Sequence, residues 1–259
     1  MCFIVFAYQV HPAYRFIAAA NRDEFYERPT SPATFWKEAP QVLAGRDLKE
    51  GGTWMGVTRG GKFAAITNYR DPSTFQTTAP SRGKLVSNFL TSSESAASYV
   101  ERISRKGQSY NGFSLICGDL RDLFVYSNRG KIEKLGPGIY GLSNHLLDSP
   151  WPKIIKGRKA LTAAMHKKGA DLEAALFEIL SDRKIAADRR LPSTGIELEK
   201  ERLLSSIFIQ SPGYGTRSSS LLLMARNRRV KFVEVVFDGS PEPWVESRFS
   251  FRILPDLLR

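Results

Sequence analysis

The feature that constrains this chain most is its first apolar run, which begins directly after Cys2. A second apolar run ends in the polar segment Asn21-Arg22-Asp23-Glu24, and Pro12 between the two runs suits a turn. The two runs are therefore predicted to pair as antiparallel strands. Pairing of Tyr8 with Arg15 would put Cys2 opposite Asn21, and a slip of one or two residues would keep Cys2 beside the same polar segment.

This position gives Cys2 a chemical meaning. Methionine before a small residue is commonly removed, so we expect the mature chain to start at Cys2, with a thiol and a free α-amine on one residue. An α-amine titrates near ~7.7–8.0 and can take the thiol proton, which makes such a residue a nucleophile. Arg22 would favour the thiolate, and Asp23 or Glu24 would orient the ammonium. The alternative is that Cys2 is a small buried apolar residue, as cysteine often is.

Short motifs along most of the chain carry a family resemblance. They are Met1-Cys2, Ala20-Asn21-Arg22-Asp23-Glu24-Phe25, Gly51-Gly52-Thr53-Trp54, Thr67-Asn68-Tyr69-Arg70, Leu142-Ser143-Asn144-His145 and Gly215-Thr216-Arg217. With them the chain resembles the NRDE family, which includes the transport and Golgi organisation proteins of eukaryotes and many bacterial members. That family in turn resembles, more distantly, the N-terminal-nucleophile hydrolases, especially the cysteine amidases that cleave penicillin V and conjugated bile acids.

The resemblance implies roles for three further residues. Asn68 and Asn144 look like the asparagines that serve the oxyanion or the substrate in those amidases, and Arg217 looks like the arginine kept near the nucleophile. By themselves, the asparagines are equally well read as turn formers or caps and Arg217 as a surface cation. The remaining polar and aromatic residues of the motifs are candidates for binding; they are Asn21, Glu24, Trp54 and Tyr69.

The acidic motif departs from the amidase pattern. The amidases place arginine and aspartate three residues apart, whereas Arg22 and Asp23 are adjacent here. Neighbours on a strand face opposite sides of the sheet. Both side chains therefore reach Cys2 only if the backbone turns at this point.

Hairpins of strands are predicted toward both ends of the chain, with helices grouped between them, which favours an α+β fold of antiparallel sheets. The family resemblance implies the four-layer αββα sandwich of the N-terminal-nucleophile hydrolases. Phe25–Leu43, rich in proline and aromatic residues, is expected to be an ordered loop, and Ile185–Leu198 an exposed and mobile one. The expected strands are Thr53–Thr58, Lys62–Asn68, Phe113–Gly118, Leu123–Ser127, Lys131–Leu135, Leu221–Ala225, Val230–Phe237 and Arg248–Leu254. The expected helices are Ser81–Leu90, Glu94–Arg105, Trp151–Lys168, Asp171–Leu180 and Glu199–Ser205.

Composition narrows the class of protein. A chain of 259 residues with 42% hydrophobic and 25% charged residues fits one soluble globular domain, residues 1–259. Two cysteines, Cys2 and Cys117, give no disulfide framework, and neither a membrane-spanning run nor a signal peptide is present, so a cytoplasmic protein is expected. The net charge of +12 comes from scattered clusters without a nucleic-acid-binding motif, so solvated surface is favoured over a nucleic-acid partner, and anionic ligands stay open.

Two functions follow as hypotheses. The first is a hydrolase in which Cys2 forms a thioester with an amide or ester substrate and water then releases the acid. The second is a carrier or chaperone on the same fold, because members of this family are connected with haem movement and with lipid or acyl-CoA handling. Both use an anionic or amphipathic small molecule; metal-ligand spacing and cofactor fingerprints are absent, so no metal or cofactor is expected. The sequence does not fix an oligomeric state.

Overall fold

The predicted opening hairpin organises the first of two sheets. The computed structural model describes residues 3–240 and 244–254. Strand β1 (Phe3–Tyr8) pairs antiparallel with β2 (Tyr14–Phe25), and Phe3 is the partner of Asn21. All six residues of β1 are buried, as the continuous apolar run of the sequence requires for a strand covered on both faces.

The register of this hairpin is one residue away from the predicted one. Tyr8 pairs with Phe16 instead of Arg15. The turn gives the reason, because Gln9 adopts a positive φ of 58° and donates its N–H to the Arg15 carbonyl at 2.8 Å. The connection thereby closes between Gln9 and Arg15. The predicted pairing of Cys2 with Asn21 concerns a residue that lies outside the described part of the chain.

The first sheet joins both ends of the described chain. Its order places β2 beside the long strand β12, so the polar end of β2 lies next to the segment Gly215–Arg217. A short strand pairs with β12 off this path. In spatial order the strands are β10 (Gly138–Leu142), β1, β2, β12 (Tyr214–Ala225), β13 (Arg229–Val236) and β14 (Val245–Arg252), with β11 (Gln210–Ser211) on β12.

The second sheet is a meander in which each strand pairs with the next in sequence. Every pair is antiparallel, as in the first sheet. Its members are β3 (Thr30–Phe35), β4 (Val42–Asp47), β5 (Met55–Thr58), β6 (Phe63–Asn68), β7 (Phe113–Gly118), β8 (Leu123–Ser127) and β9 (Ile132–Lys134).

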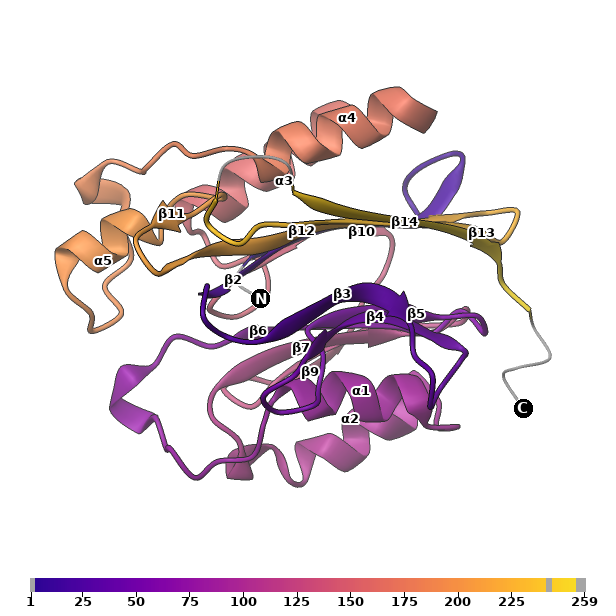
Figure 1. The fold of residues 1–259 in the computed structure, drawn as a ribbon, viewed down its shortest axis with the longest axis horizontal. Helices are drawn as coiled ribbons and strands as arrows, with labels where there is room; N and C mark the ends of the chain where they lie inside the picture. The colour runs from indigo at the N-terminus through magenta and orange to yellow at the C-terminus, as the bar shows by residue number, and fades with distance from the viewer. Residues whose placement is uncertain (1–2, 241–243, 255–259) are drawn as a thin grey trace.

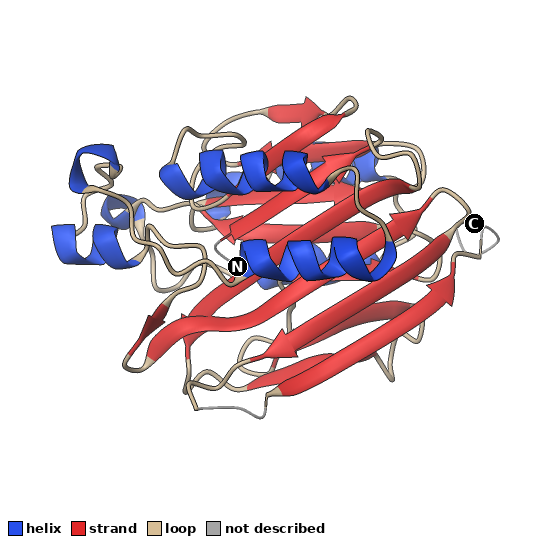
Figure 2. Ribbon diagram, turned by 90° about the horizontal axis from the view of Figure 1, so that it is seen from above, coloured by secondary structure: helices blue, strands red, loops and turns tan. Residues whose placement is uncertain are grey.

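Helices cover the outer face of each sheet (Figures 1 and 2). Two of them pack on the second sheet and two on the first, so the layers follow the order α, β, β, α. The predicted α+β sandwich of antiparallel sheets is confirmed. The helices are α1 (Gly83–Thr91), α2 (Ala96–Ser104), α3 (Pro152–Ala164), α4 (Gly169–Leu180) and α5 (Leu198–Leu203), with short 3₁₀ helices η1 (Pro72–Thr74), η2 (Gly107–Ser109) and η3 (Asp188–Arg190).

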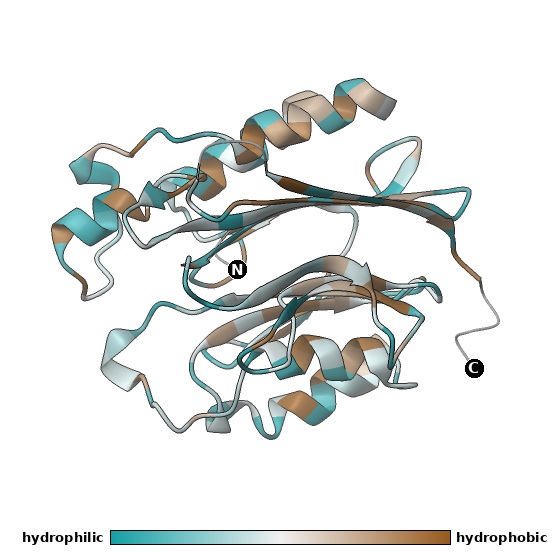
Figure 3. Cartoon of the chain, in the orientation of Figure 1, coloured by the Kyte–Doolittle hydropathy of each residue, from teal (hydrophilic) through white to brown (hydrophobic). Residues whose placement is uncertain are grey.

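Strand alternation divides the apolar residues of β1 between two cores. Ile4 and Phe6 point between the sheets, whereas Phe3 and Val5 point toward α3 and α4. A third core fills the space between the second sheet and its helices, and it holds the fully buried Cys117 predicted as a packing residue. In Figure 3, hydrophobic residues (brown) recur along the strands and helices that enclose these cores. Three apolar layers therefore hold the two sheets and their helices together.

One predicted loop is a strand. Phe25–Leu43 was expected to be an irregular segment, but it contains β3 and the start of β4. The strand tolerates Pro32 because β3 is an edge strand and its pairing is irregular between Ser31 and Thr34. The segment Ile185–Leu198 is exposed or half-buried as predicted and contains η3.

Candidate active site

A polar cleft lies where the end of β6, the residues before β5 and the start of α1 meet β2. Its volume is about 220 Å³. Four predicted site residues line it: Arg22, Glu24, Trp54 and Asn68. The structure therefore brings together residues from three of the sequence motifs.

The strand alternation of β2 divides its polar motif between two faces. Arg22 and Glu24 line the cleft. Asn21 and Asp23 are buried and contact the opposite side, where the Asn21 amide donates to the carbonyls of Leu180 and Ile207 at 2.9 and 2.8 Å. Because β2 runs as a strand to its last residue, the adjacent arginine and aspartate do not face the same way.

Hydrogen bonds from β12 hold the side chains of Asn21 and Asp23 in place. Ser219 donates its hydroxyl to Asn21 at 2.7 Å, and Thr216 donates its hydroxyl to Asp23 at 2.8 Å. These two hydrogen bonds join the polar end of β2 to β12. Asn21, predicted as a binding residue, thus has its amide engaged in internal hydrogen bonds.

Arg22 is the central cation of the cleft. Its guanidinium lies over the Trp54 ring, 4.4 Å from the ring centroid, and 3.9 Å from the Glu24 carboxylate. Burial lowers the pKa of Arg22, which nevertheless stays a cation because arginine titrates far above neutrality. The indole fits only because position 45 is glycine, where an added Cβ would lie 2.4 Å from the Trp54 ring.

Arg28 and Asp47 extend the charged wall, and the sequence analysis did not single them out. Arg28 donates from Nη2 to Asp47 at 2.7 Å and lies 3.7 Å from Glu24. Although burial opposes the shift, the hydrogen bond and charge of Arg28 lower the pKa of Asp47, so the pair is ionised at neutral pH. Glu24 and Arg28 are only four residues apart, so their proximity could be expected from the sequence. Asp47 belongs to another strand, β4, and no local pattern predicts that it lies beside Arg28.

Asn68 lines the cleft, and Asn144 contacts Asn68. Asn68 is the last residue of β6, and its side-chain amide makes no hydrogen bond to any described residue. Asn144 donates its amide to the Asn68 backbone carbonyl at 3.1 Å, and the Asn144 carbonyl accepts from the Arg70 N–H at 2.8 Å. Asn68 therefore offers a donor to the cleft, while Asn144 holds Asn68 in place.

Tyr69 points away from this donor and contacts His145. The Tyr69 hydroxyl is 2.8 Å from Nε2, and His145 Nδ1 is 2.7 Å from the Ser149 hydroxyl. Ser149 donates to the Leu146 carbonyl, so the serine accepts the Nδ1 proton and Nε2 accepts from Tyr69. Burial lowers the pKa of His145, which fits this neutral form. Tyr69 was predicted to bind ligand, yet its hydroxyl is part of this internal chain.

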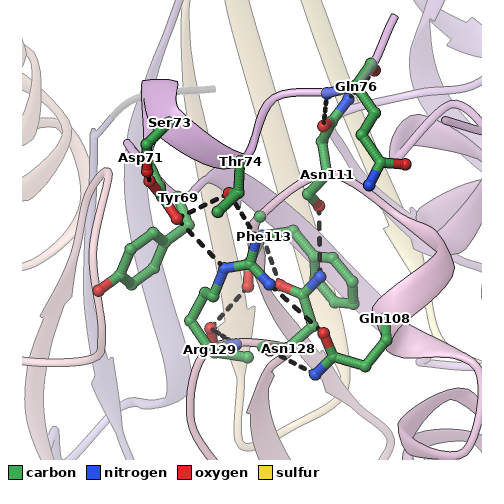
Figure 4. A network of polar contacts seen from close by, with 12 residues as sticks. Tyr69, Asp71, Ser73, Thr74, Gln76, Gln108, Asn111, Phe113, Asn128 and Arg129 are labelled. Atoms are coloured by element: carbon green, nitrogen blue, oxygen red, sulfur yellow. Dashed lines mark hydrogen bonds and ion pairs between the residues drawn. The ribbon is translucent and has the colours of Figure 1, made fainter. Parts of the chain in front are cut away.

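The outer wall of the cleft is the segment between β6 and α1, and a polar network holds it (Figure 4). Arg129 donates to Thr74 at 2.7 Å and lies 3.6 Å from Asp71. Asn111 exchanges two hydrogen bonds of 2.7 Å with the backbone of Gln76. The segment is thereby positioned by side chains that follow it in the sequence by some 35 to 58 residues.

Arg217 supports the cleft from behind. It lies at an irregularity of β12, between Thr216 and Ser218, which frees its side chain from the strand alternation. One guanidinium nitrogen donates to the carbonyls of Phe25, Tyr26 and Arg28 at 2.8, 2.9 and 3.1 Å, and Nε donates to Phe237. Arg217 thus fixes the turn that presents Arg28. Burial lowers its pKa.

Within residues 3–240 and 244–254, no cluster of histidine, cysteine and carboxylate side chains could hold a metal ion. None of the helices in these ranges is long and apolar enough to cross a bilayer.

Solved structures share this sandwich. The N-acylethanolamine-hydrolyzing acid amidase ortholog of Caenorhabditis elegans superimposes with a TM-score of 0.52 at 11% identity, over 86% of this chain and 92% of the nematode chain. At this identity the similarity shows the fold. It confirms the predicted sandwich of the N-terminal-nucleophile hydrolases.

Sequence relatives cover the whole chain. Residues 1–239 match the family described as Transport and Golgi organisation 2. The bovine Transport and Golgi organization protein 2 homolog is 39% identical over 98% of this chain and 99% of its own length, and the human homolog is 37% identical over the same shares. The predicted NRDE resemblance is therefore confirmed, and the chain belongs to the Transport and Golgi organisation 2 family.

Proposed function

We propose that this protein is a cysteine hydrolase of the N-terminal-nucleophile type, with Cys2 as the nucleophile after removal of Met1. One observation carries the proposal: Phe3, which follows Cys2 in the sequence, pairs with Asn21, the neighbour of Arg22. Ile4 and its partner Ala20 both point between the sheets, and strand alternation puts Arg22 on the same face as Ala20. Arg22 would then favour the thiolate.

The proposed reaction is acyl transfer. The α-amine takes the proton of the Cys2 thiol, and the thiolate attacks the substrate carbonyl. The α-ammonium then gives this proton to the leaving nitrogen as the carbon–nitrogen bond breaks, which leaves a thioester. Water, deprotonated by the α-amine, then releases the carboxylic acid and restores the thiol. The side-chain amide of Asn68, which lines the cleft, is the proposed donor to the developing oxyanion, for which an uncharged donor suffices.

The substrate class follows from the cleft and from the shared fold. The nematode protein with the same fold is named for amide hydrolysis, which favours amides over other acyl compounds. Charged side chains of both signs line the cleft, because Arg22 and Arg28 stand beside Glu24 and Asp47, and Trp54 supplies an apolar wall. An amide with an amphipathic acyl part fits these groups.

A panel of N-acyl amides and acyl thioesters tests the proposal. Hydrolysis by the purified protein is expected to disappear in Cys2→Ala and to persist in Cys117→Ala, because burial raises the pKa of Cys117 and keeps it a thiol. Equal turnover by Cys2→Ala and the parent protein would refute the assignment.

A carrier function has one observation in its favour. Phe75 is 61% exposed and lines the same cleft as Trp54, beside arginines and carboxylates. Aromatic side chains next to a polar lining of both charges suit reversible binding of an amphipathic ligand such as haem or an acyl-CoA. A titration with either compound separates the functions, because a carrier retains its affinity in Cys2→Ala while showing no turnover in the parent protein.

A further inference from the structure

A second concave surface lies on the outer side of the sandwich, away from the cleft residues. It is formed by α3 and the segment that links α4 to α5, and its volume is about 530 Å³. We name it the basic groove. Six cationic side chains line it with a single carboxylate; the cations are Lys153, Lys156, Lys159, Lys184, Arg189 and Arg190.

Four of these six cations have no acidic partner among the described residues. Lys156 pairs with Asp182, and buried Lys153 donates to the Leu204 carbonyl. The side chains of Lys159, Lys184, Arg189 and Arg190 are exposed or nearly so and form no ion pair with any described residue. Many other arginines are neutralised, as Arg202 is by Asp188 and Arg102 by Glu94. The groove therefore concentrates uncompensated positive charge.

Bulky apolar side chains stand among these cations. Ile155 of α3 is 47% exposed and Ile185 is 58% exposed, and both line the groove. Exposing two isoleucines to water at one site is unfavourable in free energy, and this penalty is removed when the side chains enter an apolar phase. Cations around exposed aliphatic side chains are the pattern of a surface that lies on a membrane interface.

We propose that the basic groove docks the protein on membranes rich in anionic phospholipid. The cations would contact lipid phosphates and carboxylates while Ile155 and Ile185 enter the headgroup region. Nucleic acid fits less well, because none of the residues lining the groove is aromatic and so none offers a stacking platform.

The segment carrying η3 and α5 and the segment carrying η1 project from the same end of the molecule (Figure 1). The buried ion pair of Arg70 and Glu201 joins them.

Vesicle sedimentation tests the proposal. The full chain is mixed with vesicles of phosphatidylcholine alone or of phosphatidylcholine with phosphatidylserine. Binding is expected only with phosphatidylserine and is expected to weaken as salt rises. Each basic residue near an anionic bilayer changes affinity roughly fivefold, so Lys184→Glu/Arg189→Glu/Arg190→Glu should weaken binding by roughly a hundredfold or more.

Matched variants separate this surface from general charge. Lys37→Glu/Lys106→Glu/Lys131→Glu reverses three exposed lysines that form no ion pair with described residues and lie outside the groove, and it should bind far more tightly than the groove variant. Ile155→Gln/Ile185→Gln should also weaken binding, whereas Val10→Gln, at another exposed apolar residue, should not. Circular dichroism checks that each variant is folded.

Three results would overturn the proposal. The first is no binding of the parent protein to phosphatidylserine vesicles at low salt. The second is equal loss in the groove and control triple variants, which would show that net charge alone acts. The third is saturable binding of inorganic pyrophosphate or of duplex DNA that depends on the groove residues while vesicles are ignored.

Discussion

The side-chain amide of Asn144 donates to the backbone carbonyl of Asn68 at 3.1 Å, and so joins two motifs that are 76 residues apart. The two asparagines were predicted to act alike, but their surroundings differ. Asn68 lines the cleft with an amide that forms no hydrogen bond with the described part of the chain, and Asn144 uses its own amide to position the end of β6. This division leads to different expectations for the two substitutions.

We predict that Asn68→Ala lowers kcat by about 10²–10³-fold, the usual effect of losing an oxyanion donor, while leaving stability within about 0.5 kcal/mol. Asn144→Ala removes an internal hydrogen bond and should lower the free energy of unfolding by about 1 kcal/mol. Turnover assays and urea titrations measure both effects, with Asn227→Ala in an exposed turn as the control. Unchanged kcat in Asn68→Ala would remove Asn68 from the mechanism.

The buried ion pair behind the cleft should matter for stability. Arg70 donates to Glu201 at 2.7 Å, with the side chains 9% and 4% exposed. Arg70→Met leaves a buried carboxylate uncompensated and should cost about 3–5 kcal/mol in the free energy of unfolding. Arg202→Met, which breaks partly exposed pairs with Asp188 and Glu199, should cost only about 0–1 kcal/mol. Equal losses in the two variants in urea titrations would contradict the assigned burial.

Glu234 should make stability depend on pH. It is fully buried, accepts hydrogen bonds from the Ala33 N–H at 2.7 Å and the Ser220 hydroxyl at 3.1 Å, and burial raises its pKa above the ordinary 4.5. Above pH 4.5 the unfolded chain loses this proton before the folded protein does. The Glu234 contribution to stability is therefore fully present below pH 4.5 and is lost as pH rises through the folded pKa.

Glu234→Gln should remove this dependence, because an amide resembles the protonated acid. Urea titrations at several pH values measure the unfolding free energy of both proteins. As pH rises above 4.5, the parent protein should lose stability relative to Glu234→Gln. Glu173→Gln is the control with the opposite sign. Its hydrogen bonds to Lys231 and Arg248 outweigh burial and lower the pKa of Glu173, so the difference in unfolding free energy between the parent protein and Glu173→Gln should change only below pH 4.5. A flat difference for Glu234→Gln would contradict the burial of a proton-binding carboxyl.

Close packing at the chain start gives another prediction. An added Cβ on Gly157 of α3 would lie 2.5 Å from Phe3 Cζ and 3.0 Å from Val5 Cγ1. Gly157→Ala should therefore cost about 1–3 kcal/mol through overpacking, against roughly 1 kcal/mol gained in helix propensity. Thermal unfolding measures the balance, and Gly136→Ala, with no heavy atom within 4 Å of the added Cβ, is the control. A rise in the melting temperature of Gly157→Ala would contradict the prediction, because it would show that the Phe3 side chain moves aside at little cost in free energy.

Local patterns predicted much of this fold. Strands β7 and β8 match the expected ranges residue for residue, because short apolar runs between turn signals are a local property of the sequence. The register of the first hairpin was missed by one residue because it depends on the φ angle of Gln9. Strand β3 was missed because Pro32 reads as a loop residue until the pairing irregularity beside it is known.

The site was predictable only where a motif carried it. Arg22, Glu24, Trp54 and Asn68 were identified from short motifs, and they line one cleft. The separate faces of Arg22 and Asp23 follow from strand alternation, which the sequence analysis had raised as an objection. Asp47 and the wall segment held by Arg129 arise from contacts between distant elements, and no local pattern encodes them.

Intact-mass analysis of the purified protein during turnover shows whether Cys2 is the nucleophile. We expect a chain that lacks Met1 and, with a slowly hydrolysed acyl substrate, carries one acyl group that peptide mapping assigns to Cys2. We also expect this adduct to be absent from Cys2→Ala. A chain that keeps Met1 while hydrolysing the substrate, or an adduct on any residue other than Cys2, would contradict this assignment.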